Sequence, residues 1–330
     1  MTLTELSLQQ FRSYAKRTFV FSPHTTLIVG PNTAGKTNIL EAIALLSTGK
    51  SFRADKDGEM VKWWAEFGRV KATIDDTTLE VLVTATKKYV VNGIPRRQID
   101  FVGNLLTVLF WPEHLELITD SPSIRRKYLD SVLVQVDREY RRNLLSYERG
   151  IRQRNSLLRL INEGKGNRAQ LLFWDQLLIK SGAYITDKRI EFIEFVNTHQ
   201  HTMQIHYDKS IISVSRLAQY ALEEVAAGVT LVGPHRDDYI FLERERDISK
   251  YGSRGEQRLA VLRLKLAELV YIEEKTGERP ILLLDDIFSE LDVEHRKLVL
   301  EIVDKQQTII TSADEDIIKL FSKKIDVINI

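Results

Sequence analysis

The feature that most constrains this chain is the octapeptide at residues 30–37, which reads Gly-Pro-Asn-Thr-Ala-Gly-Lys-Thr. The apolar, β-branched run 25–29 precedes it, and apolar residues at helical spacing follow it over 38–46. The octapeptide therefore lies on a turn from strand to helix, which is the context that a phosphate-binding loop requires. Gly30 and Gly35 let successive backbone N–H groups converge on an anion, and the helix start adds its positive dipole end.

Two side chains of this loop have expected contacts of their own. Lys36 can reach the β- and γ-phosphates of a nucleotide and is a catalytic candidate, and the Thr37 hydroxyl can ligate Mg²⁺. The residues predicted to bind ATP are Gly30, Pro31, Asn32, Thr33, Ala34, Gly35, Lys36, Thr37 and Asn38. Arg12, in a turn between two predicted strands, is a further candidate for approaching the nucleotide. The alternative for Arg12 is a solvated turn arginine.

A second motif ends in two acidic residues. The aliphatic run 281–284 predicts a buried strand, and Asp285 and Asp286 follow it. Acids at the carboxyl end of a parallel strand lie where α/β sheets place ligand chemistry. Asp285 suits a magnesium ligand, and Asp286 suits a catalytic group that orients or deprotonates the attacking water.

A helix start near residue 253 has two interpretations. Ser253 is a good N-cap, and Glu256 three residues later completes a capping box. The structural interpretation ends there. The functional interpretation is that Ser253 and the adjacent N–H groups bind a phosphate. Because the chain already has its own phosphate loop, this second anion site would serve the nucleotide of another subunit.

The pattern along the chain predicts an interrupted domain. Alternating apolar residues indicate a β-rich lobe before residue 95, and long helical patterns run from about 123 to 197. A strand expected at 229–232 then resumes the first domain. We therefore expect a discontinuous head at 1–122 and 229–330, and an α-helical lobe at 123–228.

The helical insertion holds a charge that the whole chain conceals. The chain has 47 basic and 46 acidic residues, which gives a net charge of +1. Between residues 125 and 168 there are 12 basic and 5 acidic residues, so the local balance is 12 − 5 = +7. Arginine predominates there, which favours phosphate contacts. A solvated helix face is the alternative, and any DNA contact would be to the backbone and sensitive to salt.

Other features exclude some classes of protein. The chain has no cysteine, no apolar run long enough to span a membrane and no secretory signal pattern, so we expect a cytoplasmic protein. The histidines at 199, 201 and 206 lack a nearby cluster of Asp and Glu and have no cysteines beside them, and we interpret them as surface or turn residues. The tryptophans at 63, 64 and 111 are expected in the core, and the alternative is that they stack on a ligand.

Together these motifs resemble the ABC-type ATPase heads of the SMC-related kind, and among them the RecF family of bacterial recombination mediators. The matching segments are 11–14, 30–43, 49–53, 110–130, 147–155, 233–238 and 251–258. The resemblance implies an α/β fold in which a phosphate-loop parallel sheet and an antiparallel β lobe carry an inserted helical lobe.

The resemblance also implies a mechanism. ATP would drive formation of a homodimer in which Lys36, Thr37 and Asp285 of one subunit face the signature of the other. The residues acting in trans would be Ser253, Arg254, Gly255, Gln257 and the interface-loop residue Asp292. It further implies slow ATP hydrolysis, DNA binding, and help in loading recombinase at gapped DNA with RecO and RecR.

Two other functions remain open. The ATPase subunit of a membrane ABC transporter would share the phosphate loop but would lack a basic helical insertion of this length. A scaffold that uses ATP only structurally would bind nucleotide without hydrolysing it.

Overall fold

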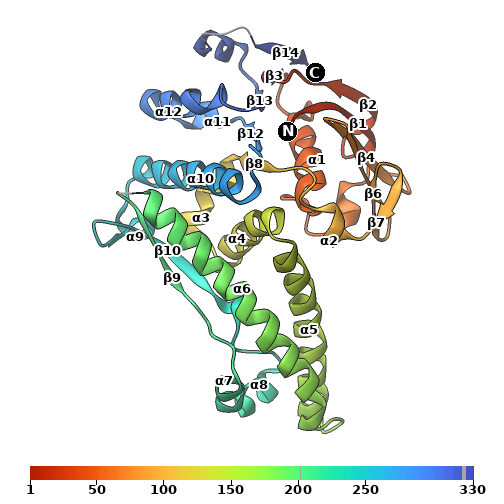
Figure 1. The fold of residues 1–330 in the computed structure, drawn as a ribbon, viewed down its shortest axis with the longest axis vertical. Coiled ribbons are helices and arrows are strands. Elements are labelled where there is room, and N and C mark those ends of the chain that lie inside the picture. The colour runs from red at the N-terminus through yellow and green to blue at the C-terminus, as the bar shows by residue number, and fades with distance from the viewer. Residues whose placement is uncertain (201, 322–324) are drawn as a thin grey trace. The chain divides into compact units, whose positions relative to one another are not determined.

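The computed structural model of the chain describes residues 1–200, 202–321 and 325–330 (Figure 1). It divides into two compact units, which we call unit 1 (Met1–Leu115 with Val261–Ile330) and unit 2 (Glu116–Ala260). Helix α10 (Arg254–Thr276) begins in unit 2 and ends in unit 1. The first and last segments of the chain therefore fold together, with unit 2 inserted between them.

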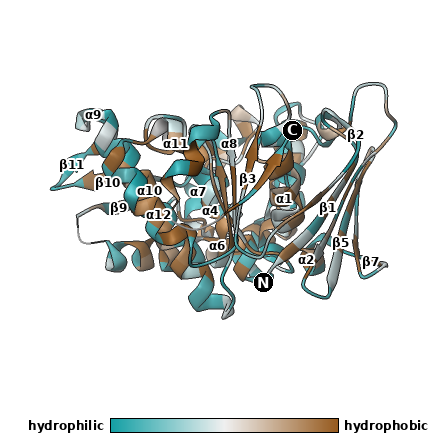
Figure 2. Cartoon of the chain, turned by 90° about the horizontal axis from the view of Figure 1, so that it is seen from above, coloured by the Kyte–Doolittle hydropathy of each residue, from teal (hydrophilic) through white to brown (hydrophobic). Residues whose placement is uncertain are grey.

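Unit 1 contains two sheets. The parallel sheet has the strand order β14-β3-β13-β12-β8. Its strands are β3 (Thr25–Val29), β8 (Thr107–Phe110), β12 (Ile281–Asp285), β13 (Thr308–Ser312) and β14 (Asp326–Asn329). β3, β12 and β13 are buried along their whole length, as expected for strands covered on both faces. The strands around β3 carry much of the hydrophobic colouring in Figure 2.

The second sheet of unit 1 is antiparallel, with the order β2-β1-β4-β5-β6-β7. Its strands are β1 (Leu3–Phe11), β2 (Tyr14–Val20), β4 (Gly68–Ile74), β5 (Thr77–Val83), β6 (Lys87–Val91) and β7 (Ile94–Arg96). The β-rich lobe expected from alternating apolar residues is thus confirmed. The hairpin between β6 and β7 turns at Asn92 and Gly93, both at positive φ.

Helix α1 (Lys36–Thr48) packs between the two sheets. It contacts β12 and β13 of the parallel sheet and β4 and β5 of the antiparallel sheet. The sequence predicts one apolar face, but burial extends round nearly the whole helix, including Glu41. The shorter helices of unit 1 are α2 (Gln98–Phe101), α11 (Ile287–Glu290), α12 (Val293–Val303), and the 3-10 turns η1 (Asp57–Met60), η2 (Pro112–Leu115) and η5 (Glu315–Leu320).

Unit 2 is built on two long helices that lie side by side (Figure 1). These are α5 (Arg138–Asn162) and α6 (Leu172–His199), close to the helices predicted from the sequence. A Cβ at Gly150 of α5 would lie 2.9 Å from the Leu178 side chain of α6, so this glycine permits the close approach of the helices.

The other elements of unit 2 are short, apart from α4. They are α3 (Glu116–Thr119), α4 (Pro122–Val136), η3 (Arg168–Leu171), β9 (Gln204–Asp208), α7 (Val214–Gln219), α8 (Ala221–Ala227), η4 (Pro234–Arg236), β10 (Asp238–Glu243), β11 (Arg246–Asp247) and α9 (Ile248–Tyr251). The three strands form an antiparallel sheet in the order β11-β10-β9.

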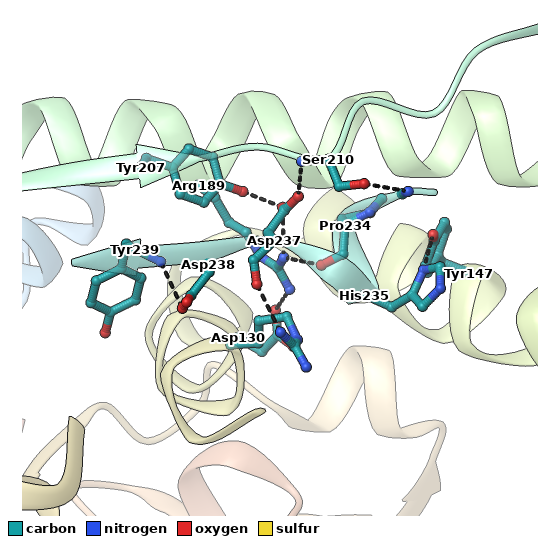
Figure 3. A network of polar contacts seen from close by, with 12 residues as sticks. Asp130, Tyr147, Arg189, Tyr207, Ser210, Pro234, His235, Asp237, Asp238 and Tyr239 are labelled. Carbon is teal, nitrogen blue, oxygen red and sulfur yellow. Dashed lines mark hydrogen bonds and ion pairs between the residues drawn. The ribbon is translucent and has the colours of Figure 1, made fainter. Parts of the chain in front are cut away.

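A buried network of charges lies where segment 233–238 leads into β10 (Figure 3). Arg189 of α6 bonds to Asp237 at 3.0 Å and to Asp130 at 2.8 Å. Asp237 is fully buried, and it also accepts hydrogen bonds from the Tyr207 hydroxyl and the Ser210 backbone N–H. The ionic partners and these donors satisfy charges that would otherwise be costly to bury. The network fixes the start of β10 against α4 and α6.

The boundaries expected at 122 and 229 differ from those of the units. Segment 229–260 belongs to unit 2 because β10 pairs with β9 rather than with a strand of unit 1. The strand predicted at 229–232 is absent from this part of the described chain. The Asn155 side chain accepts from the Thr230 N–H, and the Glu224 carboxylate accepts from the Leu231 N–H. Side chains thus replace the strand partner that the apolar run suggested.

The expectation for the paired tryptophans is wrong. Trp63 is 86% exposed and Trp64 is 99% exposed. Both lie in a tight turn, in which the Ala65 N–H donates to the Lys62 carbonyl, and Trp64 has a φ of 70°. Trp111 is half-buried and packs edge-on against Phe52.

Candidate functional site

The phosphate loop connects β3 to α1 as the sequence predicts. Gly35 has a φ of 104°, and a Cβ there would lie 2.8 Å from the Ser13 hydroxyl and 2.9 Å from the Tyr14 hydroxyl. A Cβ at Gly30 would lie 2.5 Å from the Ile330 carbonyl oxygen. Close neighbours therefore exclude a side chain at both positions, and at Gly35 the backbone conformation favours glycine as well. Thr33 also has positive φ, at 74°, which is a strained conformation for a β-branched residue.

The Lys36 ammonium is directed into the loop. Its Nζ donates to the Gly30 carbonyl at 2.7 Å and to the Pro31 carbonyl at 2.9 Å. Lys36 is only 8% exposed, so its charge lies beside the backbone N–H groups that surround an anion in such loops. The arrangement places a cation and the N-terminus of α1 at one point.

Thr37 and Asp285, both predicted magnesium ligands, lie together. The Thr37 hydroxyl donates to Asp285 Oδ1 at 3.1 Å. Two neighbouring oxygen ligands of octahedral Mg²⁺ lie about 3 Å apart, given metal–oxygen distances of about 2.0–2.1 Å. A hydroxyl and a carboxylate are also the oxygen donors that Mg²⁺ prefers. The residues therefore fit this ion in both spacing and chemistry.

A third residue of this cluster was not predicted from sequence. Thr311, at the end of β13, donates its hydroxyl to Asp285 Oδ1 at 2.6 Å. Because β13 lies between β3 and β12, Thr311 links the strand that carries the loop to the strand that carries the acid. The available signal is that Thr311 and Ser312 end an apolar run that forms the buried strand β13, but the sequence alone assigns no role to the pair.

Asp286 follows directly in a left-handed conformation, with φ 49°. Its backbone N–H donates to the Thr311 carbonyl and to the Thr311 hydroxyl, each at 3.1 Å. Asp is one of the few residues that tolerate this conformation. The backbone of Asp286 is thus fixed beside Asp285 at the carboxyl edge of the sheet.

Arg12 is held by a buried acid. Its guanidinium makes a paired contact with Glu41 of α1, at 2.8 Å and 2.6 Å, and donates to the Glu59 carbonyl at 2.7 Å. Glu41 is fully buried. Arg12 therefore fastens the β1–β2 turn to α1, and the same turn contacts the loop through the Tyr14 hydroxyl, which donates to the Gly35 carbonyl. Asn38 donates to Ser13 Oγ at 3.0 Å, beside the loop.

The predicted capping box at the start of α10 is confirmed. The Ser253 N–H donates to Glu256 Oε2 at 2.6 Å, and the Glu256 N–H donates to Ser253 Oγ at 3.3 Å. The hydrogen bond from the Ser253 N–H lowers the pKa of Glu256. Ser253, Arg254 and Gly255 are exposed, and the Gln257 amide donates to the Ile248 carbonyl at 3.2 Å.

Asp292 caps α12 in unit 1. Its Oδ1 accepts from the His295 N–H at 2.9 Å, which lowers the pKa of the carboxyl group. Its side chain is 61% exposed. Asp292 thus lies on the surface with its carboxylate tied to the helix start.

Two of the three histidines interpreted as surface or turn residues lie in the described part of the chain. The His199 ring contacts the Phe195 carbonyl at 2.9 Å, His206 is exposed on β9, and His201 lies outside the described residues. Within the described ranges, no group of three or more His, Cys, Asp or Glu side chains is arranged to hold a metal ion. No described helix combines the length and hydrophobicity needed to cross a membrane.

A phosphate loop on a parallel sheet, joined to an antiparallel lobe, defines an ATPase head of the SMC type. The family described as RecF/RecN/SMC N terminal domain matches residues 2–329. The protein named DNA replication and repair protein RecF from Lachnoclostridium phytofermentans is 36% identical, covering 94% of this chain and 92% of the relative. The chain belongs to the RecF family.

Solved structures agree with this assignment. The recombination mediator protein RecF-ATPrS of the RecFOR pathway is 33% identical with a TM-score of 0.89, covering 99% of this chain and 95% of that one. The corresponding RecF-ATP structure is 34% identical with a TM-score of 0.88, covering 95% and 92%. The fold is therefore that of RecF along nearly the whole length of the chain.

Proposed function

We propose that this protein binds ATP in the phosphate loop, dimerises on it and hydrolyses it slowly as a DNA-binding mediator of recombination. Lys36 would neutralise the β- and γ-phosphates, and the N–H groups at the start of α1 would hold them. Thr37 and Asp285 would hold Mg²⁺, which supplies charge neutralisation between the phosphates when bound. Asp286 would orient the attacking water, and its short side chain is consistent with slow turnover.

One observation supports the proposed dimer. The helix start at Ser253–Gly255 is exposed, and it contains a glycine that the fold of its own chain does not require. Apart from its chain neighbours and the backbone of its own helix, the one described atom within 4 Å of a Cβ built at Gly255 is Ser253 Oγ at 3.9 Å, and Gly255 has no positive φ. Glycine in a helix costs about 1 kcal/mol relative to alanine. A small residue at this point therefore suits the close approach of a ligand from outside the chain.

The capping box leaves Ser253 able to bind such a ligand. Its oxygen accepts from the Glu256 N–H, so its hydroxyl proton is still available to donate to a phosphate oxygen. Ser253, Arg254, Gly255 and Gln257 would thus complete the nucleotide site of a second copy, with Asp292 in the interface between copies. Each dimer would contain two composite sites related by a two-fold axis.

The cellular role follows from the family. The relatives are named DNA replication and repair proteins, and the similar structures are of a recombination mediator in the RecFOR pathway. ATP-driven dimers would bind DNA at gaps and, with RecO and RecR, help to load recombinase in the cytoplasm. No observation favours the transporter alternative.

Complementation between two inactive variants tests the composite site. Lys36→Met removes the cation of the phosphate loop. Gly255→Val would block the approach of the partner's nucleotide to the helix start at Ser253. A mixture of the two chains would contain heterodimers with one intact site, so ATP hydrolysis should return to roughly a quarter of the wild-type rate. Failure to regain any activity, with both variants folded, would show that each chain completes its own site.

DNA binding tests the cellular role separately. Purified protein should bind gapped DNA more tightly than plain duplex, and ATP should strengthen the binding. Equal affinity for both DNAs, with and without ATP, would argue against a mediator that acts at gaps.

A further inference from the structure

Nine of the 12 basic residues between positions 125 and 168 fall into two groups in the structure. Those of the first group are engaged inside unit 2. Arg125 bonds to Asp238 at 2.6 Å, and Arg154 bonds to Asp175 at 2.6 Å and to Glu224 at 2.7 Å. Arg126 donates to the Asp237 carbonyl and Arg141 to the Val134 carbonyl, each at 2.7 Å. These arginines hold the fold together and are not available to a partner.

The second group lies on one face of α5. Its members, which we call the α5 arginine stripe, are Arg138, Arg142, Arg149, Arg152 and Arg159, and all are exposed. At about 100° per residue they fall within an arc of about 100°, and they extend along about 31 Å of the helix. The opposite face is buried and includes Tyr140, Leu144, Tyr147 and Leu158. The stripe is therefore the outward face of a helix whose inner face packs in unit 2.

Three of the five arginines of the stripe are not neutralised by an ion pair within the described chain. Arg142 pairs with Glu139 at 2.8 Å in an exposed contact, which contributes little. Within the described parts of the chain, Arg149, Arg152 and Arg159 make no ion pair. The exposed face of α6 has a different character, because Lys180 is accompanied there by Asp187 and Glu194. The positive charge of unit 2 is thus concentrated on α5.

The composition of the stripe indicates which partner it fits. Protein interfaces have an apolar centre, but the only strongly exposed large hydrophobic residue of α5 in the described chain is Leu160, near the end of the helix. Single-stranded nucleic acid is usually held by stacking on aromatic side chains, and both tyrosines at the core of the α5–α6 contact are buried. Duplex DNA needs neither, since it presents a regular row of phosphates.

We propose that the α5 arginine stripe holds the phosphate backbone of duplex DNA. This inference rests on the proposed function and names the surface that performs its DNA-binding part. Duplex DNA carries one charge per about 1.7 Å of axis and turns once in about 34 Å, which is close to the length of the stripe. The planar guanidinium presents paired donors to phosphate oxygens. The contact would be independent of base sequence.

A charge-reversal pair with a matched control tests this proposal. The stripe variant is Arg149→Glu with Arg152→Glu. The control is Lys180→Glu with Lys209→Glu, which changes net charge equally at two exposed lysines of unit 2 outside α5. Affinity for a plain duplex of random sequence is measured over a salt series. In parallel, ATP hydrolysis without DNA and ATP-dependent dimerisation are measured for each protein.

The stripe variant should lose at least about tenfold in affinity, and its slope of log K against log salt should become shallower by about 2. The control should retain the wild-type slope, and all three proteins should hydrolyse ATP and dimerise alike. For Arg149→Lys with Arg152→Lys, the slope of log K against log salt should stay close to the wild-type value, because both positive charges are retained.

Three results would overturn the inference. The first is unchanged DNA affinity in the stripe variant, and the second is an equal loss in the control, which would indicate a response to net charge alone. The third is loss of dimerisation without loss of DNA affinity, which would make the stripe a protein contact. If wild-type protein binds no DNA at all, the proposed function itself fails, which is a distinct outcome.

Discussion

The two proposed half-sites for ATP differ in how they are supported. The phosphate loop is surrounded by its own chain. Asp285 accepts hydrogen bonds from two hydroxyl groups, and Lys36 is almost fully buried. The helix start at Ser253 is exposed, and its polar groups bond to nearby residues of the same unit. A half-site that is enclosed can be assembled before its ligand arrives. A half-site that is open gains its remaining contacts only from a partner.

The largest expected effect concerns the buried charges of unit 2, which also contains the helix start at Ser253. Asp237→Ala leaves the buried Arg189 with one carboxylate partner fewer and should lower the free energy of unfolding by about 3–5 kcal/mol. Chemical denaturation monitored by circular dichroism would measure this. Arg142→Ala, which removes an exposed pair, serves as a control and should change stability by less than about 1 kcal/mol.

Lys36→Met should break the enclosed half-site without unfolding it. We expect ATP hydrolysis to fall by about 10²–10³-fold, as when one preorganised donor is removed from a catalytic site. ATP should also cease to drive dimerisation in sedimentation. A variant that still dimerises fully on ATP would contradict the assignment of Lys36.

The third prediction concerns pH and His235, which lies in the segment before β10. Burial lowers the pKa of His235 to about 4, so the folded state favours the neutral ring. Below its unfolded pKa of about 6.5 the unfolded chain binds the proton first, so stability is lost as pH falls from about 6.5 toward 4. The loss should reach about 2–3 kcal/mol. The free energy of unfolding of the wild type and of His235→Gln is measured at pH 7 and pH 4.5, and the difference in their pH dependence gives the contribution of His235. An equal loss of stability in both proteins would refute the prediction.

Gly255→Ala should sharpen the comparison because its effects have opposite signs. The monomer should be as stable as wild type or more stable by up to about 1 kcal/mol, since the fold does not need this glycine. ATP-dependent dimerisation should weaken by about tenfold, or about 1.4 kcal/mol. Nucleotide binding to the monomer should not change. Unchanged dimerisation would remove the main argument for an interface at this helix start.

The smallest expected effect is strain in the enclosed half-site. Thr33→Gly should relieve part of the about 1–2 kcal/mol cost of a left-handed residue while adding freedom to the unfolded chain. We expect a gain in stability of no more than about 1 kcal/mol, measured by thermal unfolding, with ATP binding retained. A marked loss of stability would mean that the Thr33 side chain makes a needed contact.

The sequence allowed prediction of those features that short segments define. The phosphate loop, the acidic end of β12 and the capping box each depend on a few adjacent residues in a recognisable context. The contact between Thr311 and Asp285 was not predicted, because it depends on the order of strands in the sheet, which places β13 between β3 and β12. The pairing of Arg12 with Glu41 was not predicted for a similar reason, because packing of the β1–β2 turn against α1 brings the two residues together.

The unit boundary and the paired tryptophans show a second limit. Apolar residues at 229–232 suggested a strand, but side chains of α5 and α8 satisfy their backbone. Trp63 and Trp64 were placed in the core on composition alone, whereas a tight turn holds them outside. The partner of the Thr230 N–H, Asn155, lies 75 residues away in the sequence. The turn that exposes the tryptophans is local, because it is closed between Lys62 and Ala65.

The position of α1 between two sheets has a consequence for cooperativity. Because this helix contributes buried residues to both, neither sheet can separate from it without exposing the core of the other. The amide hydrogens of the two sheets should therefore exchange with solvent through shared openings of unit 1. Any ligand that steadies the first turn of α1 would then slow exchange in β4 and β5, although it touches neither strand.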